Sequence, residues 1–130
     1  MISESDARAW VAAYGDAWVT QDSAKIAKLF TDAATYQERR FRAPIRGVDA
    51  IRAYWQDLVH DLQHEVHFEP GQIAIAGDQA FLHWTAHFVW RPINGILELD
   101  AIARITFSDE TRDGLRLVSA FEEWIDSREG

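Results

Sequence analysis

The hydrophobic pattern of the chain changes its period near residue 63, and this change constrains the fold more than any other feature. Before it, apolar residues recur at helical spacing, so that Trp10, Tyr14 and Trp18 lie one above another on a helix face. After it, apolar and polar residues alternate, which is typical of strands with one buried face. Helices followed by hairpin-connected strands predict an α+β domain whose helices cover one face of an antiparallel sheet.

Three helices are expected before residue 63. Ser3 is a candidate N-cap for the first helix, and Asp22 is a candidate N-cap for the second. Residues 34–38 are then expected to form a short strand that places Tyr36 and Glu38 on the same face. The third helix carries an apolar stripe made of Val48, Ile51, Trp55, Leu58 and Leu62.

Four strands are expected in the second half, near residues 64–76, 79–91, 96–108 and 115–126. Gly77-Asp78 suits a two-residue hairpin with glycine in first place, and Asn94-Gly95 is the strongest short hairpin pattern in the chain. Residues 109–114 form a longer polar loop before the last strand.

A two-residue turn at Asn94-Gly95 would fix the register of the two strands beside it. His87 would then oppose Ile102, and Ala86 would face Ala103 in the middle of an otherwise bulky apolar wall. Small residues at this point predict a hollow on the face that the helices cover. Either a helix tryptophan fills the hollow or it is a ligand cavity, since empty apolar volume is costly.

Composition and charge exclude several classes of function. A chain of 130 residues predicts a single domain, residues 1–130. Its net charge of −8 argues against nucleic acid or an anionic membrane as a partner, and no apolar run is long enough to span a bilayer. The absence of cysteine excludes disulfides and thiol nucleophiles, and together with the polar N-terminus it leads us to expect a cytoplasmic protein.

Two clusters of side chains are candidates for binding ions. His83 and His87 share a strand face but are separated by about 13 Å at ~3.3 Å per residue, so they cannot hold one metal ion together. We therefore expect no metal and no cofactor. Arg39, Arg40 and Arg42 form the only basic cluster, which we interpret as a solvated loop, with an anion site as the alternative.

Several segments resemble, in content and order, those of the nuclear transport factor 2-like superfamily and its SnoaL-like and ketosteroid isomerase-like branch. The resemblance covers nearly the whole chain and implies a cone-shaped, cystatin-like α+β fold with three N-terminal helices packed on a curved antiparallel sheet. It leaves the activity open, because this fold hosts isomerases, cyclases, hydrolases and binding modules. The matching segments are Asp32-Ala-Ala-Thr-Tyr36, Pro44-Ile-Arg-Gly47, Ala50-Ile-Arg-Ala-Tyr-Trp55, Leu99-Asp-Ala-Ile102 and Glu122-Glu-Trp124.

The ketosteroid isomerase-like pattern implies roles for individual residues. Tyr14 matches the tyrosine that binds the oxyanion in that family, and Glu38 matches its carboxylate base. Trp55 and Trp124 match two aromatic residues of the pocket. Ala103 stands where that family has a protonated aspartic acid as second oxyanion donor. Loss of one such donor typically costs ~10² to 10³ in rate, so efficient steroid isomerisation is not expected.

The function implied by the resemblance is a SnoaL-like enzyme that acts on a hydrophobic, carbonyl-bearing small molecule by isomerase-like or cyclase-like chemistry. Glu38 would be the base and Tyr14 the hydrogen-bond donor. Glu122, on the same strand face as Trp124, is a second candidate acid. A non-catalytic module that binds an apolar ligand or another protein is the alternative, with Tyr14 as a core residue and Glu38 paired with an arginine. The expected pocket walls are Trp18, Tyr36, Trp55, Trp84, Phe88, Ala103 and Trp124.

The outer face of the predicted sheet is a candidate dimer interface. In the family that the chain resembles, this face pairs with a second subunit. The residues expected there are His83, His87, Ile102 and Arg104, and partial exposure of an apolar residue among them fits an interface.

Overall fold

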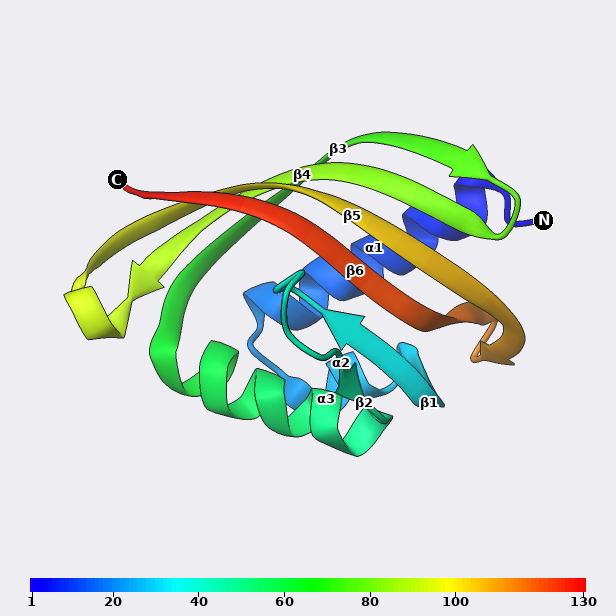
Figure 1. The fold of residues 1–130 in the computed structure, drawn as a ribbon, viewed down its shortest axis with the longest axis horizontal. Helices are drawn as coiled ribbons and strands as arrows, with labels where there is room; N and C mark the ends of the chain where they lie inside the picture. The colour runs from blue at the N-terminus through cyan, green and yellow to red at the C-terminus, as the bar shows by residue number, and fades with distance from the viewer.

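Helices cover one face of a single six-stranded sheet in the computed structural model, which describes all 130 residues (Figure 1). The helices are α1 Glu4–Val19, α2 Ser23–Ala27 and α3 Val48–Tyr54, and α3 continues as the π-helix η1 Trp55–His60. The strands are β1 Phe30–Gln37, β2 Ile45–Arg46, β3 Gln63–Ala76, β4 Gln79–Trp90, β5 Gly95–Arg112 and β6 Leu115–Glu129. The α+β class and the three N-terminal helices are therefore confirmed.

The strands follow the order β2-β1-β6-β5-β4-β3 across the sheet. β1 runs parallel to β6, and every other neighbouring pair is antiparallel. The long strands β3 to β6 curve over α1, while β1 and α3 lie below them in the view of Figure 1. None of the helices has the length and apolar content that a membrane crossing requires.

Two helix caps and the first hairpin turn were predicted correctly from short-range patterns in the sequence. Ser3 Oγ accepts a hydrogen bond from the backbone N–H of Asp6 at 3.0 Å, which caps α1. Asp22 Oδ1 caps α2 by accepting from the backbone N–H of Ala24 at 3.0 Å. Gly77 opens the hairpin between β3 and β4 with a φ of 61°, a conformation that glycine adopts without strain.

The predicted register between β4 and β5 is wrong, although the predicted faces are right. A 3₁₀ turn, η2 Arg91–Ile93, precedes Asn94, whose φ of 47° is left-handed, and this turn lengthens the connection. His87 therefore pairs with Glu98 instead of Ile102. The shift is by an even number of residues, and side chains alternate with a period of two, so every side chain keeps its face.

The hollow expected between Ala86 and Ala103 is not formed, because the corrected register no longer places these two residues opposite each other. The ring of Trp18, from α1, lies 5.4 Å from the ring of Trp84 and 6.2 Å from that of Phe88, measured between centroids. Trp18 therefore fills the space beside the small residues, which is the first of the two alternatives: a helix tryptophan and not a ligand cavity.

A β-bulge in β6 decides which of its side chains face the helices. The consecutive residues Phe107 and Thr106 of β5 pair with Val118 and Ala120, so that Ser119 is an extra residue in β6. Because side chains alternate along a strand, one extra residue reverses the phase of everything that follows it.

Beyond the bulge, Phe121 and Glu123 face the helices and are buried, whereas Trp124 faces outward and is 42% exposed. The expectation that Glu122 and Trp124 point into the interior is therefore wrong. It rested on the match of Trp124 to a pocket residue of the family, and the bulge at Ser119 sets the opposite phase.

Gly15 marks the closest approach of α1 to β3, and its replacement tests this packing. A methyl group at Gly15 would lie 2.8 Å from the Phe68 ring, which is itself packed against Tyr14 and Trp18. We expect Gly15→Ala to lower the free energy of unfolding by about 1–3 kcal/mol, despite the better helix propensity of alanine. Urea denaturation measures the change. The double variant Gly15→Ala/Phe68→Leu should recover part of the loss, and a more stable single variant would show that the contact is loose.

Candidate acid–base site

Glu38 lies directly after β1, at the end of the strand that the sequence predicted. Its carboxylate accepts a hydrogen bond from the Tyr36 hydroxyl at 3.0 Å and a second, short one from the Tyr54 hydroxyl. Tyr54 is the last residue of α3, and the π-helix η1 begins at the next residue. No ion pair joins Glu38 to an arginine, so the alternative of a surface pair does not hold.

Stacked aromatic rings hold two tyrosines behind Glu38. The Phe121 ring lies 5.2 Å from the Tyr14 ring and 5.1 Å from the Tyr36 ring, with interplanar angles of 23° and 5°. The Trp10 ring also stacks on Tyr14 at 5.3 Å, and it lies 5.9 Å from the Phe121 ring. Each stack fixes a ring plane, so the phenol groups have defined directions.

Glu123 is the second carboxyl group of the site, and it is the most deeply buried acid in the protein at 1% exposure. It lies on β6 directly opposite Ala103 of β5. One carboxyl oxygen, Oε1, has no hydrogen-bond partner. A carboxyl group from the neighbouring strand thus lies beside Ala103, where the family pattern has a protonated aspartic acid.

The environment pushes the pKa of Glu123 well above its usual value. Burial is the largest cause, the negative charge of Glu38 adds to it, and hydrogen bonding with Tyr14 only partly offsets both. A carboxyl group in such a place is neutral at pH values where an exposed glutamate is charged, and it can donate a hydrogen bond.

The pKa of Glu38 is also raised, but its causes differ. Burial raises it, while hydrogen bonds from Tyr54 and Tyr36 and the charge of Arg39 lower it. The two carboxyl groups are coupled, because the charge of one raises the pKa of the other. Glu38, with two phenol donors and a guanidinium nearby, is the group of the pair that carries the charge.

All three tyrosines have pKa values above the usual one for a phenol, so they remain protonated donors. For Tyr14, burial is the first cause, followed by the charge of Glu123. Burial is again the largest cause for Tyr36 and for Tyr54, followed by Glu123 in the first case and by Glu38 in the second. The site therefore combines three tyrosine hydroxyl donors with the carboxyl groups of Glu38 and Glu123.

The pocket residues predicted from the sequence fall into two groups. Trp18, Tyr36, Trp55, Trp84, Phe88 and Ala103 are buried in the interior, and none of them lines the hollow that opens at Glu38. Trp124 faces outward and does line that hollow, with the Arg40 guanidinium 4.4 Å from its ring centroid.

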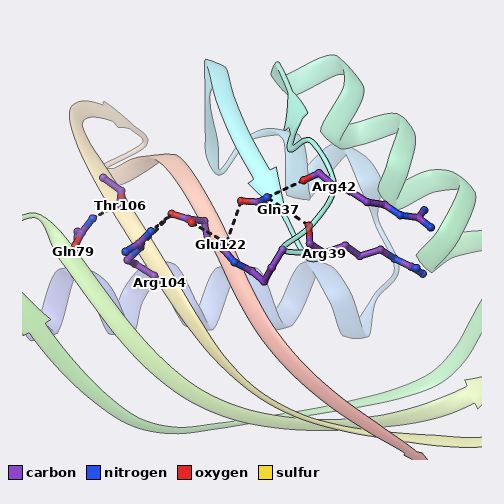
Figure 2. Close-up of polar contacts among 8 residues, drawn as sticks. Gln37, Arg39, Arg42, Gln79, Arg104, Thr106 and Glu122 are labelled. Carbon is purple, nitrogen blue, oxygen red and sulfur yellow. Dashed lines mark hydrogen bonds and ion pairs between the residues drawn. The ribbon is translucent and has the colours of Figure 1, made fainter.

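Glu122 is excluded as an acid of the interior. On the outer face it accepts hydrogen bonds from Arg104 at 2.7 Å and Arg40 at 2.9 Å, and Figure 2 shows the Arg104 contact. Burial raises its pKa, but the hydrogen bonds and charges of the two arginines outweigh this effect and lower the pKa overall.

Of the polar side chains gathered at the site, Tyr54 was missed in the sequence, and the choice between Glu122 and Glu123 as the inward acid was left open. Tyr54 precedes Trp55, which was the residue that matched the family pattern. In the sequence Tyr54 is only one more aromatic residue of the helix, and nothing indicates that its hydroxyl reaches Glu38. The burial of Glu123 depends on the bulge at Ser119. The pattern that pointed to it was the pair of adjacent glutamates ahead of Trp124, only one of which can face inward.

A hollow of about 490 Å³ opens at Glu38, lined by Glu38, Arg39, Arg40, Phe41, Arg42, Trp124 and Ile125. Behind Glu38 the aromatic rings are in contact with one another. The indole N–H groups of Trp55 and Trp84 are buried there without a hydrogen-bond acceptor. Unpaired buried donors are uncommon and costly, and they leave the interior with a capacity to bind oxygen atoms.

A model of the SnoaL-like domain matches residues 11–118 of the chain. The chain belongs to the SnoaL-like family. Solved structures agree on the fold. SalBIII, an epoxide hydrolase/cyclase-like enzyme of pyran ring formation in the polyether salinomycin, has a TM-score of 0.78 and 22% identity, covering 97% of this chain and 95% of that one.

Two further structures show the same fold. A ketosteroid isomerase-like protein from Catenulispora acidiphila in complex with trimethylamine has a TM-score of 0.72 and 16% identity, over 88% of this chain and 83% of that one. The hexachlorocyclohexane dehydrochlorinase LinA type 2 has a TM-score of 0.72 and 14% identity, over 98% and 93%. No match was found among curated protein sequences. The ketosteroid isomerase-like, nuclear transport factor 2-like fold expected from the sequence is confirmed.

The opposite environments of Glu122 and Glu123 predict opposite effects of pH on stability. The raised pKa of Glu123 adds stability below the unfolded value near 4.5, and this contribution is lost as the pH rises through the native pKa. Glu123→Gln should therefore gain stability relative to the wild type as the pH rises from about 5 to 8. Urea denaturation at several pH values measures the difference.

Glu122→Gln is the matched control, one residue away and with the same chemical change. The lowered pKa of Glu122 gives stability above about pH 4.5 that is lost as the pH falls. This variant should therefore approach the wild type at low pH. Parallel stability curves for the wild type and Glu123→Gln would contradict the neutral state of Glu123.

Proposed function

We propose that the protein is a cofactor-independent enzyme that transfers a proton on a hydrophobic, carbonyl-bearing small molecule, with Glu38 as the base. One observation carries the proposal. A half-buried carboxylate opens onto a hollow, and it is backed by protonated tyrosines and a buried, neutral carboxyl group. These are the parts that proton abstraction next to a carbonyl requires.

In this mechanism, Glu38 removes a proton from the carbon next to the carbonyl, and the electron pair of that bond moves toward the carbonyl oxygen. The raised pKa of Glu38 makes it a stronger base than an exposed glutamate. In a substrate with a neighbouring C=C bond, the proton can return to the far carbon of that bond while the double bond shifts toward the carbonyl, as in an isomerase. Alternatively, the enolate carbon can add to a second carbonyl of the same molecule, whose C=O π bond breaks and whose oxygen takes the proton, as in a cyclase.

Tyr14 and Glu123 would hold the developing oxyanion. Their raised pKa values favour the protonated forms that donate hydrogen bonds, and Glu123 Oε1 has no partner within the fold. A carbonyl oxygen reaches them by displacing aromatic rings behind Glu38, where Trp18, Tyr36, Trp55, Trp84, Phe88 and Ala103 would form the walls. The cyclase and dehydrochlorinase named among the structural relatives are also enzymes that act on small molecules.

A non-catalytic binding module is the second candidate, and the packing of the interior favours it. The Trp18 ring contacts those of Trp55 and Trp84, so the space beside Tyr14 is occupied by side chains of the protein itself. In that case ligands would bind only in the hollow outside Glu38.

We also propose that two copies of the chain pair through the outer sheet face, at His83, His87, Ile102 and Arg104. Ile102 is 43% exposed there, and its cross-strand partner Trp124 is 42% exposed. Together they make an apolar patch on a face otherwise rich in charge.

Substituting a charge into this patch tests the pairing. Ile102→Asp should convert a dimer into a monomer, as measured by size-exclusion chromatography with light scattering, because a buried unpaired carboxylate is costly. Ile93→Asp is the control, since Ile93 is equally exposed at 43% but lies in the η2 turn. A monomeric wild type, or an Ile102→Asp variant that remains dimeric, would contradict the proposed interface.

Exchange of carbon-bound protons for deuterium tests the enzyme proposal without knowledge of the natural substrate. We expect the wild type to accelerate exchange next to the carbonyl of aryl ketones, measured by NMR, and Glu38→Gln to lose at least about 10²-fold. Tyr14→Phe should lose roughly 10- to 10³-fold through its effect on the oxyanion.

Glu110→Gln, at an exposed position far along the chain from Glu38, is the control and should leave the exchange rate unchanged. Ligand binding with no exchange above the buffer rate would favour the binding module. Equal rates in Glu38→Gln and the wild type would remove Glu38 from the mechanism.

A further inference from the structure

The loop that follows Glu38 carries three arginines, and only one of them forms an ion pair. Arg40 donates a hydrogen bond to Glu122 at 2.9 Å. Arg39 and Arg42 form no ion pair with any carboxylate of the protein. What distinguishes Arg39 and Arg42 from the other arginines without an ion pair is their place, because both line the hollow at Glu38.

Side-chain contacts fix the loop in one conformation. Gln37 Nε2 donates to the backbone carbonyl of Arg42 at 2.9 Å and lies 3.5 Å from that of Arg39. The backbone N–H of Arg42 in turn donates to the Arg39 carbonyl at 3.1 Å. Figure 2 shows the Arg39 and Arg42 side chains extending in the same direction, away from Glu122. The backbone that carries the two cations is therefore held before any ligand arrives, which lowers the entropic cost of ordering the loop on binding.

The same residues line the hollow at Glu38. Its volume of about 490 Å³ suits a small organic molecule. Phe41, fully exposed, and Trp124 and Ile125, partly exposed, supply the apolar part of its lining. The hollow thus combines an apolar surface, two free guanidinium groups and one carboxylate.

We propose that Arg39 and Arg42 form an anion subsite, so that the molecule bound at Glu38 is an apolar keto acid whose carboxylate pairs with these two guanidinium groups. This inference rests on the proposed function for the identity of the reacting group. The planar guanidinium of arginine matches a carboxylate through paired hydrogen bonds, which a lysine cannot provide. The negative charge of Glu38 requires the ligand's carboxylate to lie at the arginine end, and the proton-bearing carbon then lies at the other end, next to Glu38.

A matched pair of ligands tests the subsite. Benzoylpropionate and its methyl ester share the aryl ketone and differ in the charge. Binding to the wild type is measured by calorimetry, and we expect the acid to bind about tenfold more tightly than the ester at low salt. The double variant Arg39→Gln/Arg42→Gln should lose this preference. Arg91→Gln/Arg52→Gln, which removes the same charge at two other exposed arginines, should retain it.

The outcomes separate this proposal from the enzyme proposal. Equal affinity of acid and ester for the wild type, or an acid preference that survives in Arg39→Gln/Arg42→Gln, would overturn the anion subsite. Tighter binding of the matching keto phosphonate than of the keto acid would overturn the carboxylate assignment. Glu38→Gln should keep the preference for the acid while losing proton exchange. A preference for the acid without exchange in the wild type would refute the enzyme and leave the subsite standing.

Discussion

The burial of the Glu123 carboxyl group without a counter-ion is the constraint on which the rest of the site depends. A charged carboxylate at 1% exposure would be very costly, so the group binds a proton and becomes a donor. The charge of Glu38 raises the pKa of Glu123 further, so the two acids take different protonation states. One acid stays neutral in the interior, and the other carries the charge at the hollow, held by two phenol hydroxyls.

The backbone sets this division through one irregularity. Ser119 is an extra residue in β6, and the phase reversal it causes brings Glu123 inward and sends Glu122 outward to Arg104 and Arg40. Adjacent glutamates thereby acquire opposite pKa shifts. Bulges next to active sites commonly redirect a side chain in this way. The bulge and the aromatic stacks on Phe121 together position the acid and the tyrosines.

Much of the fold follows from the sequence, because local interactions dominate it. The caps at Ser3 and Asp22, the Gly77 turn and the change of period all depend on neighbours in the chain. The β4–β5 register was wrong because a 3₁₀ turn replaced a tight one, and the faces survived only because the error was even. Such turns depend on how the two strands twist, which local patterns do not encode.

The candidate site was only partly predictable for the same reason. Glu38 and Tyr14 could be named as candidates, since each lies on an element with a clear period and matches the family pattern. The sequence could not decide between Glu122 and Glu123, because the choice depends on a bulge, and an odd shift of one residue exchanges the two faces. Tyr54 could not be found because its contact with Glu38 joins a helix end to a strand end. The unpaired arginines became visible only once the partner of Arg40 was known.

The protonation states of Glu123 and Glu38 at neutral pH test the central claim most directly. Carbon NMR of the carboxyl groups, with glutamate labelled and the two signals assigned from Glu123→Gln and Glu38→Gln, reads both states in the same sample. The account predicts a neutral carboxyl signal for Glu123 and an ionised one for Glu38 near pH 7. Two ionised signals, or a neutral Glu38 beside an ionised Glu123, would contradict it.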